Sequence, residues 1–280
     1  MTGKPSVLLD IARETVSLAE EYILRHRPTC VTVKGDRDTV TDVDIAVERL
    51  VRDTLSRRTP GVAFLGEEEG AHGGDGRTGW VLDPVDGTAN FVRALPLCGI
   101  SLAFIDHGAP VVGAITLPFL SRRYWAAVRL GAWRDGVPIR CAEISDASEA
   151  VIAVGDYGTG HDAGLRNDAA FALHRHLACR VQRLRMLGSA AVDLAFVADG
   201  TLDASITFGN APWDMAAGTV IAREAGALVL DSDGSRHTRS SRTTLALAPG
   251  LRAPVLTAVR AATIGTPYAP MNHREEEKSC

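Results

Sequence analysis

The spacing of apolar residues predicts two helices and two short strands in the first part of the chain. Over residues 7–25, apolar residues recur at nearly helical intervals with Glu and Arg between them. The same spacing predicts a helix over residues 43–56, preceded by Thr41 and Asp42 where N-cap residues belong. The short apolar runs in "VAFLGEEEG" and "GWVLDP" predict buried strands.

The pattern changes near residue 148. Before it, Gly-Ala-Pro and Pro-Phe-Leu-Ser breaks divide an apolar region into what we expect to be successive strands of a sheet. After it, predicted strands ("AVIAVG", "RVQRLRM", "LDASITF", "ALVLD", "TTLALAP") alternate with predicted helices (167–177, "SAAVDLAFVADG", "WDMAAGTVIAREAG", 253–262). We therefore predict an α/β fold with an α+β subdomain over 1–150, an α/β subdomain over 151–265 and a flexible tail over 266–280.

The composition excludes several classes of protein. Hydrophobic residues make up 46% of the 280 residues and charged residues 23%, as in a globular protein with a sizeable core. A formal net charge of -4 argues against nucleic acid as the main partner. No apolar run reaches the ~18 residues that a membrane span needs, and the five cysteines are scattered without a C-x-x-C pair. We expect a soluble, cytoplasmic protein that binds neither nucleic acid nor membrane.

Acidic residues gather at the predicted ends of strands and starts of helices. Asp83 and Asp86 follow one strand, residues 67–69 are three glutamates after another, and Asp44 and Asp214 lie at helix starts. Like charges this close repel one another and are costly to desolvate unless a cation neutralises them. An Asp-x-x-Asp alone is equally typical of a turn capped by its own side chains. Four such acidic ends together favour a site at the strand termini.

The residue types in this cluster indicate which ion it would bind. Without Cys or His at metal-ligand spacing, an oxygen-only set favours Mg²⁺ or Mn²⁺ over zinc. Gly87 and Thr88 follow directly, and a helix starting there would direct free N–H groups toward a phosphate. Two ions bridged by an aspartate are an arrangement used for displacement at phosphorus. The sequence therefore predicts a metal-dependent site for a phosphate group.

Three motifs give the chain a resemblance to a known family. "GEE" at 66–68, "DPVDGTANF" at 83–91 and "WDMAAG" at 213–218 occur in the order of the signature motifs of the inositol monophosphatase family. The chain resembles this family from its first predicted helix to about residue 262, although Ala227 replaces a glycine of the pattern. The resemblance implies an alternating α-β-α-β-α layered sandwich, usually a homodimer. It also implies lithium sensitivity.

The resemblance assigns metal ligands to this sequence. Two or three Mg²⁺ ions would bind in each site, with Mn²⁺ as an alternative. Glu67, Asp83 and the carbonyl of Val85 would hold the first ion, and Asp83, Asp86 and Asp214 the second. Glu67 would also place a more loosely bound third ion, which makes it part of catalysis.

The resemblance also assigns the reacting groups. Asp44 and Thr88 would polarise the attacking water, so no covalent enzyme intermediate is expected. Backbone N–H groups of Gly87 and Thr88 would bind the phosphate, with Lys34 nearby. Glu68 would support the ligands without binding metal itself.

The substrate is less well defined. Thr207 lies where members that hydrolyse inositol phosphates carry a glutamate that hydrogen-bonds a ring hydroxyl, an interaction worth about 1.5–3 kcal/mol. Gly188, Ser189 and Ala190 do match the segment that lines this pocket, and Asp86 would also face the substrate. Inositol 1-phosphate therefore stays a candidate beside nucleoside monophosphates, histidinol phosphate and sugar phosphates.

Two further interpretations concern a loop and a role outside catalysis. The glycines of "GDYGTGHDAG" (155–164) do not fit G-x-G-x-x-G, so we predict a substrate-side loop with contacts from Asp156, Tyr157 and His161. Some members of the family serve as partners in transcription complexes, where catalysis is dispensable. An acid at every metal-ligand position favours the small-molecule phosphatase here.

Overall fold

The computed structural model describes residues 4–36, 38–74, 76–160, 163–209 and 211–269. The helices are α1 (Pro5–Arg25), α2 (Asp42–Arg58), α3 (Thr88–Val92), α4 (Ala163–Leu177), α5 (Ala190–Ala198), α6 (Pro212–Glu224) and α7 (Arg252–Thr263). The strands are β1 (Val31–Gly35), β2 (Asp38–Thr41), β3 (Ala63–Gly66), β4 (Ala71–His72), β5 (Gly79–Asp86), β6 (Gly99–Asp106), β7 (Ala109–Leu117), β8 (Arg122–Ala127), β9 (Ala132–Arg134), β10 (Val137–Pro138), β11 (Val151–Val154), β12 (Arg183–Arg185), β13 (Ala204–Phe208), β14 (Leu228–Leu230) and β15 (Thr243–Leu247).

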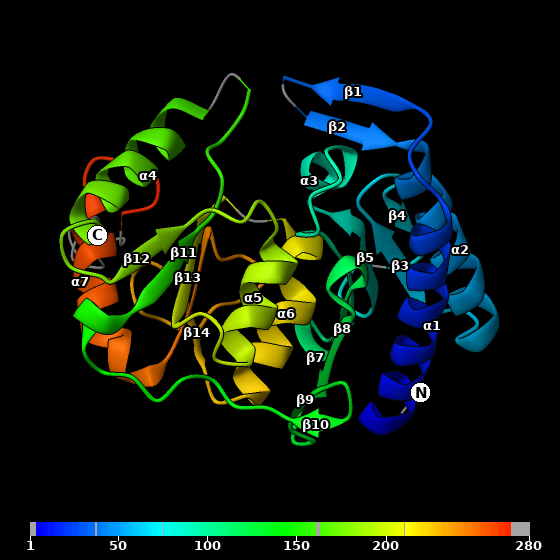
Figure 1. Cartoon of the computed structure of the whole chain (residues 1–280). Coiled ribbons are helices and arrows are strands. Elements are labelled where there is room, and N and C mark those ends of the chain that lie inside the picture. Colours follow the sequence, from blue (N-terminus) through cyan, green and yellow to red (C-terminus); the bar gives the residue numbers. More distant parts are fainter. Residues whose placement is uncertain (1–3, 37, 75, 161–162, 210, 270–280) are drawn as a thin grey trace, which may run out of the picture.

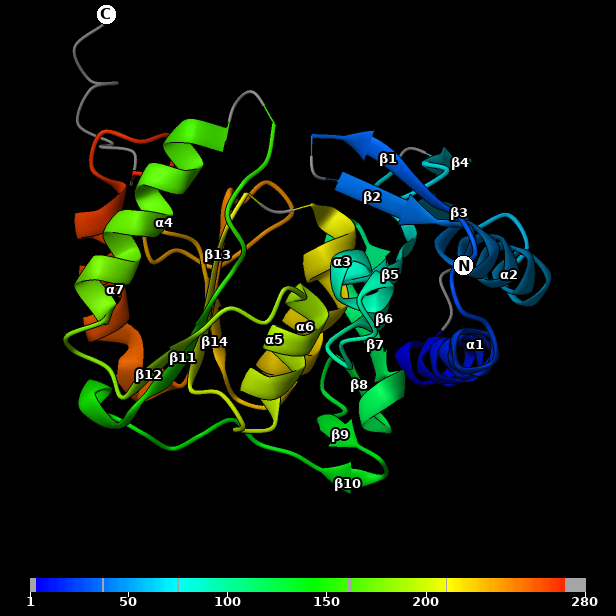
Figure 2. The ribbon, with the colours of Figure 1, turned by 45° about the horizontal axis from the view of Figure 1, so that its top comes forward.

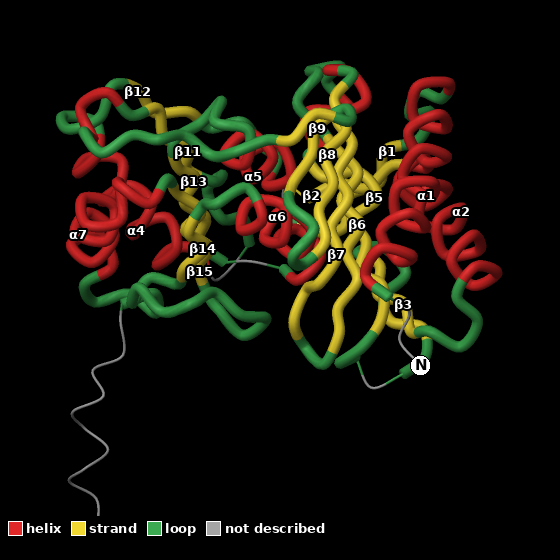
Figure 3. The backbone as a smooth tube through the Cα atoms, turned by 90° about the horizontal axis from the view of Figure 1, so that it is seen from below, coloured by secondary structure: helices red, strands yellow, loops and turns green. Residues whose placement is uncertain are grey.

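These elements form five layers, which confirms the predicted α-β-α-β-α sandwich. Figure 1 shows α1 and α2, then a large sheet, α5 and α6, a smaller sheet, and finally α4 and α7. The tube in Figure 3 shows the same succession from below. The large sheet has the order β10-β9-β8-β7-β6-β5-β3-β4, and its described pairings are antiparallel except β3 with β5. In the smaller sheet, β12-β11-β13-β15-β14, strand β11 runs parallel to both of its neighbours.

The helices and strands that the sequence predicted are observed as the predicted type, and mainly their first and last residues differ. The helix expected over 43–56 runs Asp42–Arg58, and the helix expected from 167 already begins at Ala163. The β1–β2 hairpin was not predicted, because every residue of β1 is exposed and its sequence lacks a buried face. Figure 2 shows this hairpin standing apart from the large sheet, on the side of α3.

Helix α6 joins the two sheets through very close packing. A Cβ atom at Gly113 of β7 would overlap the backbone carbonyl of Ala217, and one at Gly218 would overlap the Leu194 side chain of α5. The small residues of the "WDMAAG" motif therefore let α6 lie directly on the large sheet. Its apolar cluster combines residues of the large sheet, of α5 and α6, and of the smaller sheet. The division into subdomains at residue 150 stays a prediction.

The start of the predicted tail packs against the smaller sheet, where the rings of Tyr268 and Phe208 have centroids 5.2 Å apart. Of the predicted tail, the structure describes residues 266–269, where the Thr266 amide donates to the Thr263 carbonyl, and the remainder lies outside the described residues. Within the described residues, we find no helix with the length and apolar character that crossing a membrane requires.

Candidate active site

A cavity of about 260 Å³, here called the acidic cavity, opens where β5 ends and α6 begins. It brings together most of the predicted site residues: Glu67, Asp83, Val85, Asp86, Gly87, Thr88, Gly188, Ser189, Ala190, Thr207 and Asp214. These residues come from both sides of the boundary near residue 150. Lys34, Asp44 and Glu68 do not line the cavity but contact or neighbour residues that do.

The start of α2 places Asp44 behind the cavity. Thr41 is the N-cap: its hydroxyl accepts from the Asp44 amide at 3.3 Å, and Asp44 Oδ2 accepts from the Thr41 amide at 3.1 Å. The other oxygen, Oδ1, accepts from Thr88 Oγ1 at 3.0 Å. Burial raises the pKa of Asp44, against the lowering effect of the hydrogen bonds from Thr41 and Thr88. A capping box thus holds one carboxylate against the hydroxyl predicted to act with it.

The end of β5 turns sharply at a glycine. Gly87 has φ +90°, and a Cβ there would lie 3.0 Å from the carbonyl oxygens of Gly188 and Leu97. Asp86 Oδ2 accepts from the Ala191 amide, and Asn90 Nδ2 donates to the carbonyls of Leu97 and Leu187 at 2.7 Å each. These contacts bind the segment 86–90 to the loop before α5. Two distant parts of the sequence are thereby fixed together at the cavity.

Three aspartates of the acidic cavity have pKa values above the ordinary value of the residue. Burial, followed by the charges of Glu67 and Asp86, raises the pKa of Asp83 well above its ordinary value. Burial also raises the pKa of Asp86 to about 6, although the hydrogen bond from the Ala191 amide lowers it. For Asp214, burial and the charge of Asp86 raise the pKa to about 7. A bound cation would relieve both the desolvation and the mutual repulsion.

The glutamates after β3 form an ion-paired rim. Lys34 Nζ lies 3.0 Å from Glu67 Oε1 and 2.8 Å from Glu68 Oε1. Burial raises the pKa of Glu68 to about 7, against the hydrogen bond from Lys34. Fully buried Glu48 holds this turn by accepting from the Glu68 amide at 2.8 Å and the Glu69 amide at 2.7 Å. Glu68 thus lies behind Glu67, in a supporting position.

The donor set suits a hard divalent cation. Carboxylate oxygens and the Val85 carbonyl are the ligand types that Mg²⁺ prefers. Within the described part of the chain, however, no three His, Cys, Asp or Glu side chains already stand close enough to form a ligand cluster. Side-chain movements would therefore be needed to bring the oxygens of these carboxylates, which share one cavity, around one ion.

The acidic cavity also contains residues that the sequence did not indicate. They are Asp38, Thr39, Ala89, Arg166, Asp193, Gly209 and Met215. Asp193 is 2% exposed, and among the described residues its Oδ1 has no hydrogen-bond partner. Burial, followed by the charge of Asp86, raises the pKa of Asp193 well above its ordinary value. Its sequence context, inside the apolar helix "SAAVDLAFVADG", carried no signal for this position.

Arg166 brings a positive charge to this acidic surrounding. Its Nη2 donates to the Asp156 carbonyl at 3.3 Å, and its Nε has no partner among the described residues. A Cβ at Gly158 would lie 2.8 Å from Arg166 Cδ, and one at Gly209 would lie 3.2 Å from its Nη1. Two glycines therefore make room for the guanidinium beside the cavity.

The predicted substrate-side loop reaches the cavity with part of its residues. Asp156 lines it, and the Gly160 amide donates to Asp36 Oδ2 at 3.2 Å, so the loop meets the β1–β2 hairpin. Tyr157 does not line the cavity; its ring packs on Phe171 with centroids 4.6 Å apart. His161 lies outside the described residues.

Comparison with known proteins supplies the observation that decides the family. The model of the inositol monophosphatase family matches residues 4–264. The chain belongs to the inositol monophosphatase family. It is 36% identical over 235 residues to a probable inositol 1-monophosphatase of Mycobacterium tuberculosis, covering 84% of this chain and 87% of the relative. It is 34% identical over 208 residues to a fructose-1,6-bisphosphatase/inositol-1-monophosphatase of Thermotoga maritima, covering 74% and 77%.

Solved structures agree with this membership. An IMPase from Thermotoga maritima superposes with a TM-score of 0.84 at 30% identity, covering 91% of this chain and 98% of the other. SuhB of Mycobacterium tuberculosis has a TM-score of 0.77 at 35% identity, covering 93% and 98%. As a member of the inositol monophosphatase family, the chain is a phosphatase that hydrolyses small phosphate monoesters.

Proposed function

We propose that the protein hydrolyses a small phosphate monoester in the presence of Mg²⁺, with water as the nucleophile. The observation that carries this proposal is that buried Asp83 and Asp86 and half-buried Asp214 share one cavity beside Gly87 and Thr88. Glu67, Asp83, Asp86, Asp214 and the Val85 carbonyl would hold the ions. Bound there, Mg²⁺ supplies Lewis-acid activation of water and neutralises phosphoryl charge.

The Asp44–Thr88 pair is suited to orienting the water and taking its proton. The Thr88 hydroxyl is 3.0 Å from Asp44 Oδ1 and 3.0 Å from the Val85 carbonyl, so its hydrogen has two nearby acceptors. Its lone pairs can then accept a hydrogen bond from water, while Asp44 accepts the proton passed on by the hydroxyl. Burial of Asp44 keeps bulk water away from this relay.

Phosphate binding is proposed at the turn after β5. Gly87 is the N-cap of α3 and Thr88 its first residue, so their N–H groups have no acceptor within the helix. Lys34 lies at the rim, paired with Glu67 and Glu68. The phosphate would approach between these groups and the carboxylates.

Inositol 1-phosphate is the first candidate substrate, supported by the name of the Mycobacterium tuberculosis relative. Arg166 favours a second candidate, a sugar phosphate with another anionic group, because a guanidinium binds phosphate or carboxylate with paired hydrogen bonds. The name of the Thermotoga maritima relative agrees with that alternative. Thr207 lines the cavity as expected and offers a neutral hydroxyl there.

The test is phosphate release from inositol 1-phosphate, 2'-AMP, 5'-AMP, histidinol phosphate, glucose 1-phosphate and fructose 1,6-bisphosphate. Each is measured with Mg²⁺, with EDTA and with Asp83→Asn as the blank. Arg166→Gln should raise KM about tenfold for fructose 1,6-bisphosphate and leave inositol 1-phosphate nearly unchanged. Rates that equal the blank on every substrate would contradict a small-molecule phosphatase of this range and favour the transcription-complex partner.

Three further properties belong to this proposal. Lithium should inhibit by replacing Mg²⁺, and full activity in 100 mM LiCl would contradict that. Light scattering should give the mass of a homodimer rather than about 29.7 kDa. A cytoplasmic location is testable by fractionation.

A further inference from the structure

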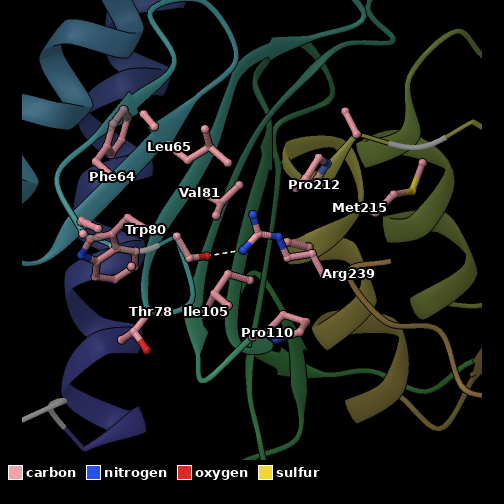
Figure 4. Close-up of a pocket in the computed structure, with 18 of the residues that line it drawn as sticks. Phe64, Leu65, Thr78, Trp80, Val81, Ile105, Pro110, Pro212, Met215 and Arg239 are labelled. Carbon is pink, nitrogen blue, oxygen red and sulfur yellow. Dashed lines mark hydrogen bonds between the residues drawn. The ribbon is translucent and has the colours of Figure 1, made fainter. Parts of the chain in front are cut away.

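A second cavity, of about 300 Å³, lies on the opposite side of the first turn of α6. We call it the apolar cavity. Figure 4 shows Val81 and Ile105 of the large sheet on one side, and Pro212 and Met215 of α6 on the other. Phe64, Leu65, Trp80, Pro110 and Ala216 complete its apolar wall. The cavity opens to solvent beside exposed Gly73, Gly74 and Gly76, and its volume lies at the lower end of ligand-pocket volumes.

One charged side chain stands in this apolar surrounding. Among the described residues that line the cavity, Arg239 alone carries a full charge at neutral pH. Figure 4 shows its guanidinium reaching across the cavity toward Val81, with a hydrogen bond to the Gly76 carbonyl. No carboxylate of the described residues forms an ion pair with Arg239. Most of its N–H donors therefore have no partner within the part of the chain that the structure describes.

A buried hydroxyl gives a second, independent indication. Thr219 of α6 lines the cavity and is 1% exposed, yet its Oγ1 has no hydrogen-bond partner among the described residues. A helical threonine usually donates to the carbonyl four residues earlier. A buried polar group without a partner costs free energy, which a ligand atom would recover.

We propose that the apolar cavity is a second small-molecule site, which binds a compact apolar molecule carrying one anionic group. The apolar walls match the body of such a ligand, Arg239 matches its charge, and Thr219 offers a hydrogen bond at depth. His237 at the wall already pairs with Thr244 Oγ1 at 2.9 Å, so it does not compete for the anion. Met215 lines both cavities, so the occupant would touch the residue next to Asp214.

The probe is 8-anilinonaphthalene-1-sulfonate, which has apolar rings and one sulfonate. It is titrated into the full chain in EDTA by fluorescence, so the result does not depend on phosphatase activity. We expect one saturable site. Arg239→Ala should weaken binding about fivefold, whereas Arg236→Ala, an exposed arginine of the same segment, should change it less than twofold.

Two controls locate the site and its charge requirement. Ala216→Phe should remove saturable binding by filling the cavity, while Asp83→Asn in the acidic cavity should leave it unchanged. N-phenyl-1-naphthylamine lacks the sulfonate, so its affinity should be equal in the wild type and Arg239→Ala.

The outcomes separate clearly. Saturable sulfonate binding that weakens in Arg239→Ala alone among the arginine variants supports the proposal. Equal affinity in the wild type and Arg239→Ala, or no saturable binding, overturns it. If circular dichroism shows that Ala216→Phe fails to fold, the comparison of Arg239→Ala with Arg236→Ala and the neutral probe still tests the proposal. Both arginines are exposed, so replacing them should not prevent folding.

Discussion

The acidic and apolar cavities share one wall, the first turn of α6, and differ in almost every other respect. The acidic cavity collects carboxylates whose pKa values burial raises, whereas the described lining of the apolar cavity has one full charge, on Arg239. The acidic cavity contains carboxylates that repel one another until a cation binds. The apolar cavity is space that the surrounding side chains leave unfilled. Neighbouring sites on one helix can therefore have opposite chemistry, and variants should affect them separately.

The largest separate effect should come from the metal-ligand positions. Asp83→Asn or Asp214→Asn should lower phosphate release on the order of a thousandfold or more, since each would remove a ligand of the metal ions that act on the phosphoryl group. In EDTA above pH 7, the same variants should melt at a higher temperature than the wild type, because burial and the charge of Asp86 oppose ionisation of Asp214. Calorimetry checks this, and a wild-type rate in either variant would contradict the metal assignment.

The next effect concerns the proton relay. Asp44→Asn should lower kcat on the order of a hundredfold, because the amide cannot take a proton from Thr88. Asp42→Asn is the matched control: it lies in the same turn, but its carboxylate accepts from the Thr29 amide at 3.0 Å and the Cys30 amide at 3.2 Å. Equal losses of kcat in both variants would indicate that α2 has been disturbed rather than the relay.

A substitution in β7 where it packs against α6 should instead affect both cavities. Gly113→Ala should destabilise the fold by about 1–3 kcal/mol, because the added methyl group overlaps the Ala217 carbonyl. Gly164→Ala in α4 is the control: the added methyl group has no neighbouring atom within 4 Å, so the substitution should be neutral or stabilise the fold by up to about 1 kcal/mol. Urea unfolding measures both. Sulfonate-probe affinity and phosphate release should fall together in Gly113→Ala, and loss of only one would show that α6 does not couple the cavities.

The smallest effect should be a pH dependence that is opposite for the two cavities. Burial, then the charge of Arg223, lowers the pKa of His237 to about 4 from 6.5. The unfolded chain then binds more protons between these pH values, so stability falls as pH drops from 6.5 to 4, by on the order of 1–3 kcal/mol. In His237→Gln, the free energy of unfolding should fall less between pH 6.5 and pH 4.

The acidic cavity should give the reverse slope. Asp214 has a pKa raised from 3.8 to about 7, so the folded metal-free protein binds the extra proton and loses stability as pH rises through that window. Urea titrations in EDTA at pH 4.5, 5.5, 6.5 and 7.5 give the free energy of unfolding of the wild type, His237→Gln and Asp214→Asn. The difference between the wild type and each variant gives the contribution of that residue at each pH. The same slope in His237→Gln as in the wild type would contradict the assignment to His237.

The contrast between the cavities also explains what the sequence could predict. The layered fold and the gathering of Asp83, Asp86 and Asp214 followed from short contiguous motifs, each at the end of an apolar segment. The residue types alone predicted an oxygen-ligand site. Their roles as ligands or proton acceptors stay predictions.

The rest had no local signal. Arg166 lies in the first turn of α4, which begins at Ala163, whereas the sequence pattern predicted a start at 167. Asp193 lies in an otherwise apolar helix. The exposed β1–β2 hairpin has no buried face to create a pattern. The apolar cavity arises from how far α6 stands from β5 and β6, a distance that depends on tertiary packing and not on any one segment.

The position of α6 in the chain has a consequence for biosynthesis. The apolar face that α6 covers includes Val81, Ile105 and Ile115, all made long before Pro212. From Pro138, where the last strand of the large sheet ends, to Pro212 is 74 residues, or roughly 4–15 s of translation at ordinary speed. During that time the nascent large sheet exposes one apolar face, which is open to chaperones and to other nascent chains. The helix that completes the acidic cavity therefore also ends the interval in which the chain is most prone to aggregate.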